Sequence, residues 1–279
     1  MLSRLRRSGK GMLGVTLLGL VVACAVLAPY VAPHDPRAQD ITRRFRPPFF
    51  AAGGQPEHLL GTDQLGRDLL SRIIWGSRVS LLVGCSAVLI SGSIGTLVGL
   101  WAGFRGGWLD TVVTRLADIQ LAIPFLALAI TVLAVLGAGL PQLIGVLGVT
   151  GWVLYGRVVR GQVFAIRALD YIEAARALGV PSWRVVLRHV LPNVAPSINV
   201  IATLEVGRMI LAEASLSFLG LGVQPSVPTW GAIAADGRDY IATAWWVATF
   251  PGGAILLTAL AVNYVGDWLR DVADPTLRV

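Results

Sequence analysis

The sequence predicts an all-α integral membrane protein with six membrane-spanning helices. Hydrophobic residues make up 55% of the 279 residues and charged residues only 14%, whereas about a quarter of the residues in a soluble domain are charged. The mean hydropathy is +0.69. Several uncharged runs also reach the roughly 20 residues that a helix needs to cross the hydrocarbon core of a bilayer.

The first predicted span runs from Gly11 to Pro33 and follows a basic N-terminal stretch. A basic start, an apolar run and small residues before Cys24 are also typical of a secretory signal peptide. The apolar run continues past Cys24, however, which is long for a signal peptide and sufficient for a span. We therefore expect residues 1–33 to form a cytoplasmic N-terminus and the first transmembrane helix.

Residues 34–78 lie between the first two predicted spans and are expected to be extracytoplasmic. Apolar side chains recur at four-residue spacing on one side of residues 61–78, which indicates an interfacial helix there. The second span is predicted from Val79 to Phe104, a stretch without charges. Residues 79–279 are thus expected to form a core of five membrane helices.

The third and fourth spans are predicted within the uncharged stretch from Ile119 to Gly156, which contains 38 residues. As one helix this stretch would be about 57 Å long at 1.5 Å per residue, nearly twice the ~30 Å hydrocarbon core. A cluster of helix breakers at residues 137–141, Gly-Ala-Gly-Leu-Pro, marks the turn between two helices.

The fifth span, from Val194 to Leu221, contains Glu205, Arg208 and Glu213, and the sixth runs from Tyr240 to Gly266. A charge at mid-membrane costs about 2.5–3.5 kcal/mol on insertion scales. Glu205 and Arg208 stand three residues apart and can pair on one helix face, which lowers this cost. The three charged residues are either neutralised against neighbouring helices or are candidates for a translocation path.

The distribution of Lys and Arg predicts the orientation. With a cytoplasmic N-terminus, the cytoplasmic parts are residues 1–11, 104–118, 157–193 and 267–279, and they hold 14 basic residues against eight outside. Cytoplasmic loops of membrane proteins carry the excess of Lys and Arg. Both termini are therefore predicted to lie in the cytoplasm.

The polar stretch 170–193 is predicted to be cytoplasmic and to form two short helices up to a break at Pro192. Asp170 and Glu173 have the spacing of a capping box that starts the first helix. Gly179 can adopt the left-handed conformation that ends it, and Pro181 or Ser182 then starts the second helix. An apolar stripe is predicted on the second helix, formed by Trp183, Val186, Leu187, Val190 and Leu191. The stripe can pack under the protein's own helices, lie on lipid or dock into a partner's groove.

The sequence lacks the G-x-x-x-x-G-K-[ST] motif that cradles nucleotide phosphates, so this chain is not expected to bind a nucleotide by such a loop. Its histidines, His34, His58 and His189, do not have the spacing of a zinc enzyme, and both cysteines lie in apolar runs. We expect no catalytic residues, no metal site and no cofactor in this chain. The net charge of +7 is assigned to cytoplasmic loops and not to nucleic-acid binding.

The stretch 173–192 resembles a known family motif. Glu173-Ala174-Ala175, three residues, Gly179, nine residues and then His189-Val190-Leu191-Pro192 is similar to the EAA loop of permease subunits in binding-protein-dependent ABC importers. His189 stands where that motif usually has Ile. Four other stretches resemble the dipeptide, oligopeptide and nickel branch of this family: 61–68, 216–222, 229–231 and 266–271. The resemblance extends over nearly the whole chain, and it is strongest to the C-type permease.

This resemblance implies a type I ABC importer permease fold in the bacterial cytoplasmic membrane. It implies that the EAA loop couples the permease to an ATPase, through Glu173, Ala174, Ala175, Gly179, His189, Leu191 and Pro192. The implied partners are a homologous permease, two ATPase subunits that carry ATP and Mg, and an extracytoplasmic substrate-binding protein. The external segments, including the turn-rich loop 222–239, are expected to meet that binding protein.

The resemblance favours a di- or oligopeptide as the substrate, with nickel, glutathione or another small solute as the alternative. An ion-coupled secondary transporter is the second alternative, because Glu205, Arg208 and Glu213 are the kinds of residue that carry protons or bind zwitterions within a membrane.

Overall fold

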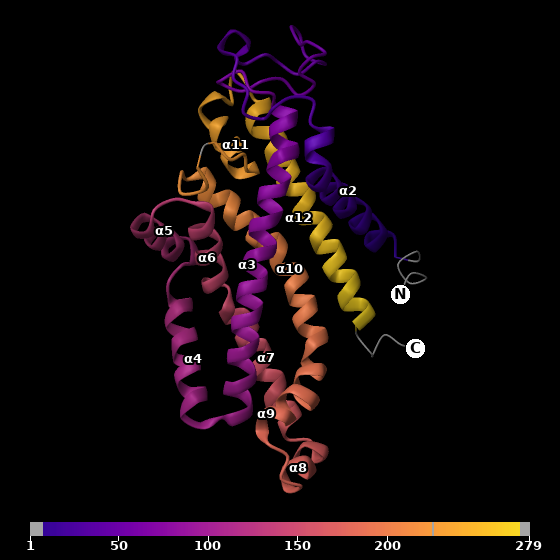
Figure 1. The fold of residues 1–279 in the computed structure, drawn as a ribbon, viewed down its shortest axis with the longest axis vertical. Coiled ribbons are helices and arrows are strands. Elements are labelled where there is room, and N and C mark those ends of the chain that lie inside the picture. The colour runs from indigo at the N-terminus through magenta and orange to yellow at the C-terminus, as the bar shows by residue number, and fades with distance from the viewer. Residues whose placement is uncertain (1–7, 225, 274–279) are drawn as a thin grey trace.

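The computed structural model describes residues 8–224 and 226–273. Within these residues all the regular elements are helices, arranged in an elongated bundle (Figure 1). Five helical segments are long and apolar enough to cross a membrane, and a bent helix pair makes a sixth if it is counted as one span. The prediction of an all-α, six-span membrane protein is therefore confirmed.

The spanning segments are α2 (Gly9–Val31), α3 (Leu69–Arg105), the bent pair α4 (Gly107–Ala122) and α5 (Phe125–Leu136), the pair α6 (Leu140–Thr150) and α7 (Trp152–Arg167), α10 (Leu191–Phe218) and α12 (Trp246–Ala273). The shorter elements are η1 (Ile41–Arg43), α8 (Asp170–Ala177), α9 (Ser182–Val185), η2 (Val186–Val190), α11 (Trp230–Asp236) and η3 (Arg238–Tyr240). Helix α8 lies at one end of the bundle, and residues 32–68 lie at the opposite end, where α11 is also found (Figure 1).

Helix α3 is the central element and packs against α2, α6, α7 and α10. Its contact with α7 is close because glycines recur every fourth residue, at Gly95, Gly99 and Gly103. A Cβ atom added at these positions would lie 2.3 Å from the carbonyl oxygen of Trp152, 2.7 Å from that of Gly156 and 2.9 Å from Val163 Cβ, respectively. Small residues at this spacing let two membrane helices approach closely.

The start of α3 differs from the sequence prediction. The helix predicted over residues 61–78 begins only at Leu69 and is the first part of α3, without a break before the membrane segment. Asp68 caps it by accepting a hydrogen bond from the Ser71 backbone N–H at 2.8 Å. With 37 residues, α3 is about 56 Å long, so it extends beyond a ~30 Å hydrocarbon core.

The third span also differs. Residues 104–118, predicted as a cytoplasmic loop, belong mostly to α3 and α4. The pair α4 and α5 is bent by 89°, because Pro124 lacks a backbone N–H and holds Ile123 in an extended conformation. The predicted turn at residues 137–141 is confirmed, since α5 ends at Leu136 and Gly137 has a φ of +85°.

A buried ionic network joins the segment before α3 to α11. The carboxylate of Asp63 accepts hydrogen bonds from Arg67 Nε at 2.7 Å and from the guanidinium of Arg72. Asp236, at the end of α11, accepts from Arg67 Nη2 at 2.9 Å and from Arg72 Nη1 at 3.0 Å. Arg72 is only 2% exposed, so its charge depends on these two carboxylates.

Replacement of Asp236 is therefore expected to destabilise the protein. Asp236→Ala leaves the buried Arg72 guanidinium with one carboxylate partner instead of two, and a hydrogen bond to a charged group contributes about 1.5–3 kcal/mol. We expect the free energy of unfolding to fall by about that amount, measured as a lower midpoint in denaturant unfolding of the purified chain in detergent.

Asp239→Ala is the matched control. Its partner Arg238 lies 3.2 Å away, but both side chains are exposed, at 74% and 53%, so the unfolding midpoint should stay near that of the wild type. An equal loss in both variants would show that the network does not stabilise this end of the bundle.

Candidate functional site

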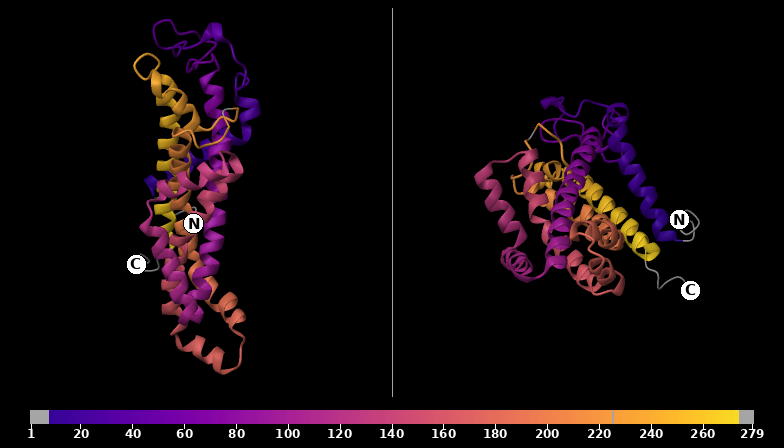
Figure 2. Two further views of the ribbon diagram at one scale, coloured as in Figure 1. Left: turned by 90° about the vertical axis from the view of Figure 1, so that its left-hand side faces the viewer. Right: turned by 60° about the horizontal axis from the view of Figure 1, so that its bottom comes forward.

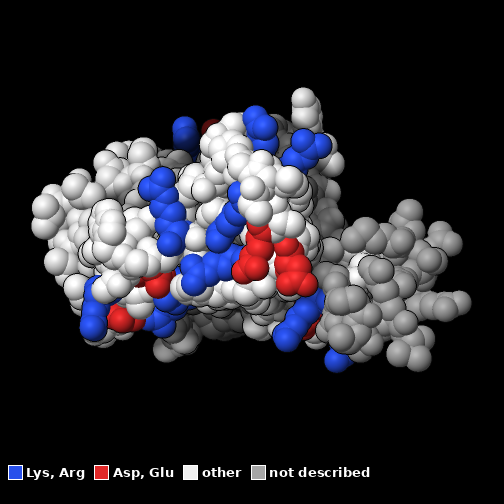
Figure 3. Space-filling model, turned by 90° about the horizontal axis from the view of Figure 1, so that it is seen from below, with Lys and Arg blue, Asp and Glu red and all other residues white. Residues whose placement is uncertain are grey.

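The strongest candidate site is the hairpin of residues 170–190, formed by α8, α9 and η2. It projects beyond the rest of the bundle at one end (Figure 2). Figure 3 views the molecule from this end and shows Lys and Arg side chains around a smaller group of acidic ones. Such a charged, protruding hairpin is suited to contact with another protein.

The turn between the two short helices of the hairpin lies at Gly179. Helix α8 ends at Ala177, and Gly179 follows with a φ of +77°. The Gly179 N–H donates to the Arg176 carbonyl at 2.9 Å, and the Val180 N–H donates to the Ala175 carbonyl at 3.1 Å. These two bonds define a Schellman motif, which satisfies the last carbonyls of a helix and reverses the chain.

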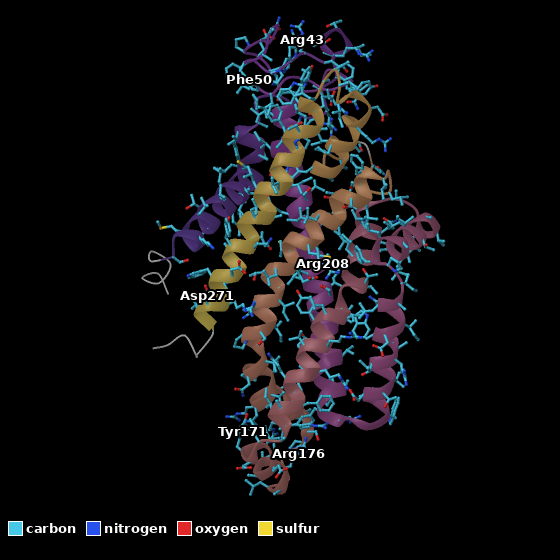
Figure 4. The ribbon with its side chains drawn as sticks, turned by 180° about the vertical axis from the view of Figure 1, so that it is seen from behind. Arg43, Phe50, Tyr171, Arg176, Arg208 and Asp271 are labelled. Carbon is cyan, nitrogen blue, oxygen red and sulfur yellow. The ribbon has the colours of Figure 1, made fainter. Side chains whose placement is uncertain are left out.

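The hairpin is joined to the membrane helices by an apolar cluster. Ile172, fully buried, shares this cluster with Leu100 and Phe104 of α3, with Val159 and Val163 of α7 and with the apolar side chains of the second half of the hairpin. The Arg176 guanidinium also lies over the Phe104 ring, 4.4 Å from its centroid. Figure 4 shows Tyr171 and Arg176 at this end of the molecule. The hairpin is thus packed on the extensions of α3 and α7.

The first helix of the hairpin begins differently from the prediction. The N-cap residue is Leu169, and Asp170 is the first residue of α8. No side-chain hydrogen bond caps this end, so the predicted capping box between Asp170 and Glu173 is wrong. Both carboxylates still lie in the first turn, where negative charge favours a helix N-terminus.

The second half of the hairpin also departs from the prediction, because Pro192 does not end it. Residues 186–190 form a π-helical turn that leads directly into α10. In an α-helix the ring of Pro192 would clash with the carbonyl of residue 188, and the wider π turn immediately before it accommodates the ring.

The apolar stripe is confirmed in part. Val186 and Val190 are buried, whereas Trp183 and Leu187 are each 52% exposed. Val185, which the predicted stripe omits, is buried instead. Most of the stripe therefore packs under the protein's own helices, and two large apolar side chains remain on the outside.

Most of the predicted coupling residues are accessible. Glu173, Ala174, Gly179 and Pro192 are exposed, and the rest of the set, Ala175, His189 and Leu191, is half-buried. Among the described residues the Glu173 carboxylate has no ion-pair partner within the chain. An unpaired, exposed charge on a rigid helix is available to an external partner.

The second candidate region consists of the charged residues of α10. Arg208 Nη1 donates to Glu205 Oε1 at 3.1 Å, so the predicted pair forms. Glu205 is 4% exposed and its Oε2 atom has no hydrogen-bond partner in the part of the chain that the structure describes, whereas the Arg208 side chain is 53% exposed. Arg208 lies about midway along the bundle (Figure 4). The pair therefore presents its positive member at the outer surface of this chain.

Glu213 lies in a different environment, fully buried between α3 and α10. Its carboxylate accepts hydrogen bonds from Ser217 Oγ at 2.7 Å and from Ser80 Oγ at 3.2 Å. Glu213 was predicted as a path candidate together with Glu205 and Arg208, but it is fully buried, whereas Arg208 is exposed. The hydroxyl partners indicate that Glu213 helps to hold α10 on α3.

Comparison with known families shows two matches. The model of the binding-protein-dependent transport system inner membrane component matches residues 95–279. A model of the N-terminal TM domain of oligopeptide transport permease C matches residues 1–48.

Several characterised sequences are similar over nearly the whole chain. The di/tripeptide transport system permease protein DppC of Pseudomonas aeruginosa is 47% identical over 270 residues, which cover 96% of this chain and 89% of the relative. The probable D,D-dipeptide transport system permease protein DdpC of Escherichia coli is 40% identical, over 93% of this chain and 85% of the relative. The glutathione transport system permease protein GsiD of Pectobacterium atrosepticum is also 40% identical, over 93% of this chain and 84% of the relative.

Among solved structures, the inward-facing MetNI methionine ABC transporter is similar, with a TM-score of 0.62 and 20% identity. The match covers 74% of this chain and 98% of that chain. It shows that the fold is that of a type I ABC importer permease.

Gly179→Ala should loosen the hairpin turn. A side chain at a positive φ costs roughly 1–2 kcal/mol, although nothing lies within 4 Å of the added Cβ. We expect trypsin to cleave at the hairpin arginines roughly 5–30 times faster under conditions where cleavage follows local opening, as measured by mass spectrometry of the purified chain.

The control is Gly161→Ala in α7, where an added Cβ also has free space but φ is not positive. That variant should be cleaved in the hairpin at the wild-type rate. An unchanged rate in Gly179→Ala would mean that the left-handed turn is not what fixes the hairpin.

Proposed function

The chain belongs to the family of inner membrane components of binding-protein-dependent transport systems, and from this premise we propose that it is one of two permease subunits of an ATP-driven importer of di- or oligopeptides. As a member of this family it is a multi-pass inner membrane protein and a transport subunit, not an enzyme. ATP hydrolysis is performed by partner ATPases. The observation that carries the proposal is the rigid hairpin with exposed EAA residues, in a chain 47% identical to a di/tripeptide permease.

The proposed substrate follows from the relatives. The similar proteins described above are named for di/tripeptide, D,D-dipeptide and glutathione transport, all small peptides or peptide derivatives. Nickel and other small solutes are the alternative substrates within the same kind of importer. Family membership favours ATP-driven transport over ion-coupled transport, which was the second alternative from the sequence.

The proposed orientation places the hairpin and both termini in the cytoplasm, because the segments that the sequence predicts to be cytoplasmic hold 14 of the 23 basic residues. Residues 34–78 and the loop 222–239 then face the outside. The buried network of Asp63, Arg67, Arg72 and Asp236 joins these two parts. We assign this external face to contact with the substrate-binding protein, since it forms one connected surface.

Coupling is proposed to occur through the hairpin. Two ATPase subunits serve the complex, one under this chain and one under a homologous permease, and each carries ATP and Mg. Glu173 pairs with a basic residue of the ATPase, while Ala174 and Ala175 permit close approach. Gly179 fixes the angle between the two short helices, and His189, Leu191 and Pro192 join the hairpin to α10. Movement of the ATPase pair thereby tilts α3, α7 and α10, which share the apolar cluster with the hairpin.

The translocation path is proposed to lie between this chain and the homologous permease. Arg208 reaches the outer surface of the chain at mid-height, held by the buried Glu205. A cation at this position suits the terminal carboxylate of a peptide. Glu213 is proposed to support the path from inside the bundle, without contact with the substrate.

Charge reversal at Glu173 tests the coupling. In Glu173→Lys, two like charges would face each other in the docking contact, at a cost of several kcal/mol. We expect loss of peptide uptake and of ATPase co-purification, with a normal amount of the chain in the membrane fraction.

Asp239→Lys provides the control, because it reverses another exposed acidic charge, in the segment beside α11 at the opposite end of the bundle. It should leave co-purification of the ATPase unchanged. Wild-type uptake by the Glu173→Lys variant would refute the role of the hairpin.

The energy source is tested with the whole complex in proteoliposomes. With ATP on the ATPase side and a protonophore present, we expect dipeptide uptake to continue, and to stop when ATP is omitted. Uptake that a protonophore abolishes despite ATP would support the ion-coupled alternative. Uptake of nickel but not of dipeptide in the same vesicles would support the alternative substrate.

A further inference from the structure

A group of three potential metal ligands lies at the end of the bundle opposite the hairpin, formed by His34, His58 and Asp68. We refer to it as the His–His–Asp cluster. Ligand atoms of the three residues all lie within 4.8 Å of one another. Asp68 Oδ1 is 2.9 Å from His58 Nδ1 and 3.7 Å from His34 Nδ1. The two imidazole rings have centroids 4.9 Å apart.

These distances fit a tetrahedral metal ion. With bonds of 2.0–2.1 Å, neighbouring donor atoms around a tetrahedral zinc ion are about 3.3 Å apart. The two measured separations, 2.9 and 3.7 Å, lie on either side of this value. The three donor atoms all lie within 4.8 Å of one another, so side-chain rotations would have to draw them together around an ion.

The carboxylate is already oriented toward the two histidines. Asp68 Oδ2 accepts hydrogen bonds from the Ser71 N–H at 2.8 Å and from Ser71 Oγ at 2.7 Å. These bonds leave Oδ1 directed at the imidazoles. The same Ser71 Oγ accepts from the His34 N–H at 3.0 Å, which fixes the backbone of one ligand residue. Hydrogen bonds that orient metal ligands in this way raise the affinity of a site.

The two histidines differ in their access to solvent. His58 is 5% exposed, and its Nε2 atom has no hydrogen-bond partner among the described residues. As a zinc ligand, His58 would bind through Nδ1, the atom that faces Asp68 Oδ1, and its ring proton would lie on Nε2. His34, by contrast, borders a hollow of about 550 Å³ together with Trp75 and Pro228. This hollow provides an entry path and room for a water molecule as a fourth ligand.

The kind of donor decides which ion fits. Two imidazole nitrogens and one carboxylate oxygen suit zinc, whereas calcium and magnesium prefer six or more oxygen ligands. We propose that the His–His–Asp cluster is a structural Zn²⁺ site. This proposal departs from our expectation from the sequence that the chain has no metal site, and it does not depend on the proposed transport function.

The site would connect three parts of the chain. His34 follows the end of α2, His58 lies in the loop between α2 and α3, and Asp68 caps α3. An ion bound to all three would fix the loop of residues 34–68 against the beginning of the central helix. Under the proposed orientation, this would stiffen the external face.

The test uses the full-length chain, purified in detergent with an affinity tag free of histidine. Cys24 and Cys85 are replaced by serine, so that thiolates do not bind metal. We expect one Zn²⁺ per chain after dialysis, measured by elemental mass spectrometry, and an affinity that His34→Ala lowers by at least about 100-fold. Co²⁺ in place of zinc should give the visible absorption of a four-coordinate ion.

His34→Ala is preferred over changes at Asp68, because Asp68 also caps α3. The His34 side chain is 38% exposed, so its removal should leave the fold intact, which circular dichroism checks. The matched control is His189→Ala, which removes the remaining histidine of the sequence, in the hairpin at the other end of the bundle. Absence of bound zinc in the wild-type protein, or equal zinc affinity in the two variants, would overturn the proposal.

Discussion

The packing of Ile172 joins the hairpin to the helices that cross the membrane, and the proposed mechanism depends on this contact. Ile172 is fully buried in a cluster that includes Phe104 of α3 and Val163 of α7. Because protein interiors are close-packed and resist compression, a force on the hairpin is transmitted to both helices. The Schellman motif at Gly179 adds rigidity, since it satisfies the carbonyls of Ala175 and Arg176 at the end of α8.

Helix α3 carries this connection along the length of the molecule. At one end, α3 contacts the hairpin through Phe104. Next to this contact, the glycines of α3 let it pack closely against α7. At the other end Asp68 caps the helix, and Arg72 joins it to α11. Both ends of the bundle are therefore attached to one continuous element. A change imposed at the hairpin can reach the opposite end of the bundle without an intermediate flexible link.

Much of the fold follows from local sequence, and the differences arise from contacts between distant residues. The uncharged runs predicted the spans, and the capacity of Gly179 for a left-handed conformation predicted the turn, because both depend on nearby residues. The loop predicted at 104–118 is instead mostly helical. Its residue Asp110, in α4, forms an ion pair with Arg160 of α7. The beginning of α3 likewise contains Arg72, whose partner Asp236 is 164 residues away.

Two further features could not be predicted from local sequence patterns. They are the π turn before Pro192 and the proximity of His34 to His58. In the candidate site, the sequence identified the EAA residues through the family resemblance, but it could not show that Glu213 is separated from Glu205 and Arg208.

The most direct test of the account measures whether the hairpin and α3 move as one body. Spin labels at Leu178 on the hairpin and Leu97 on α3, both exposed positions, would report their distance in the intact complex by pulsed electron paramagnetic resonance. The account predicts the same distance without nucleotide and with ATP trapped in the ATPases, while the distance from Leu178 to a label on the homologous permease changes. A hairpin that shifts relative to Leu97 between the two states, with no movement of α3 relative to the other permease, would contradict it.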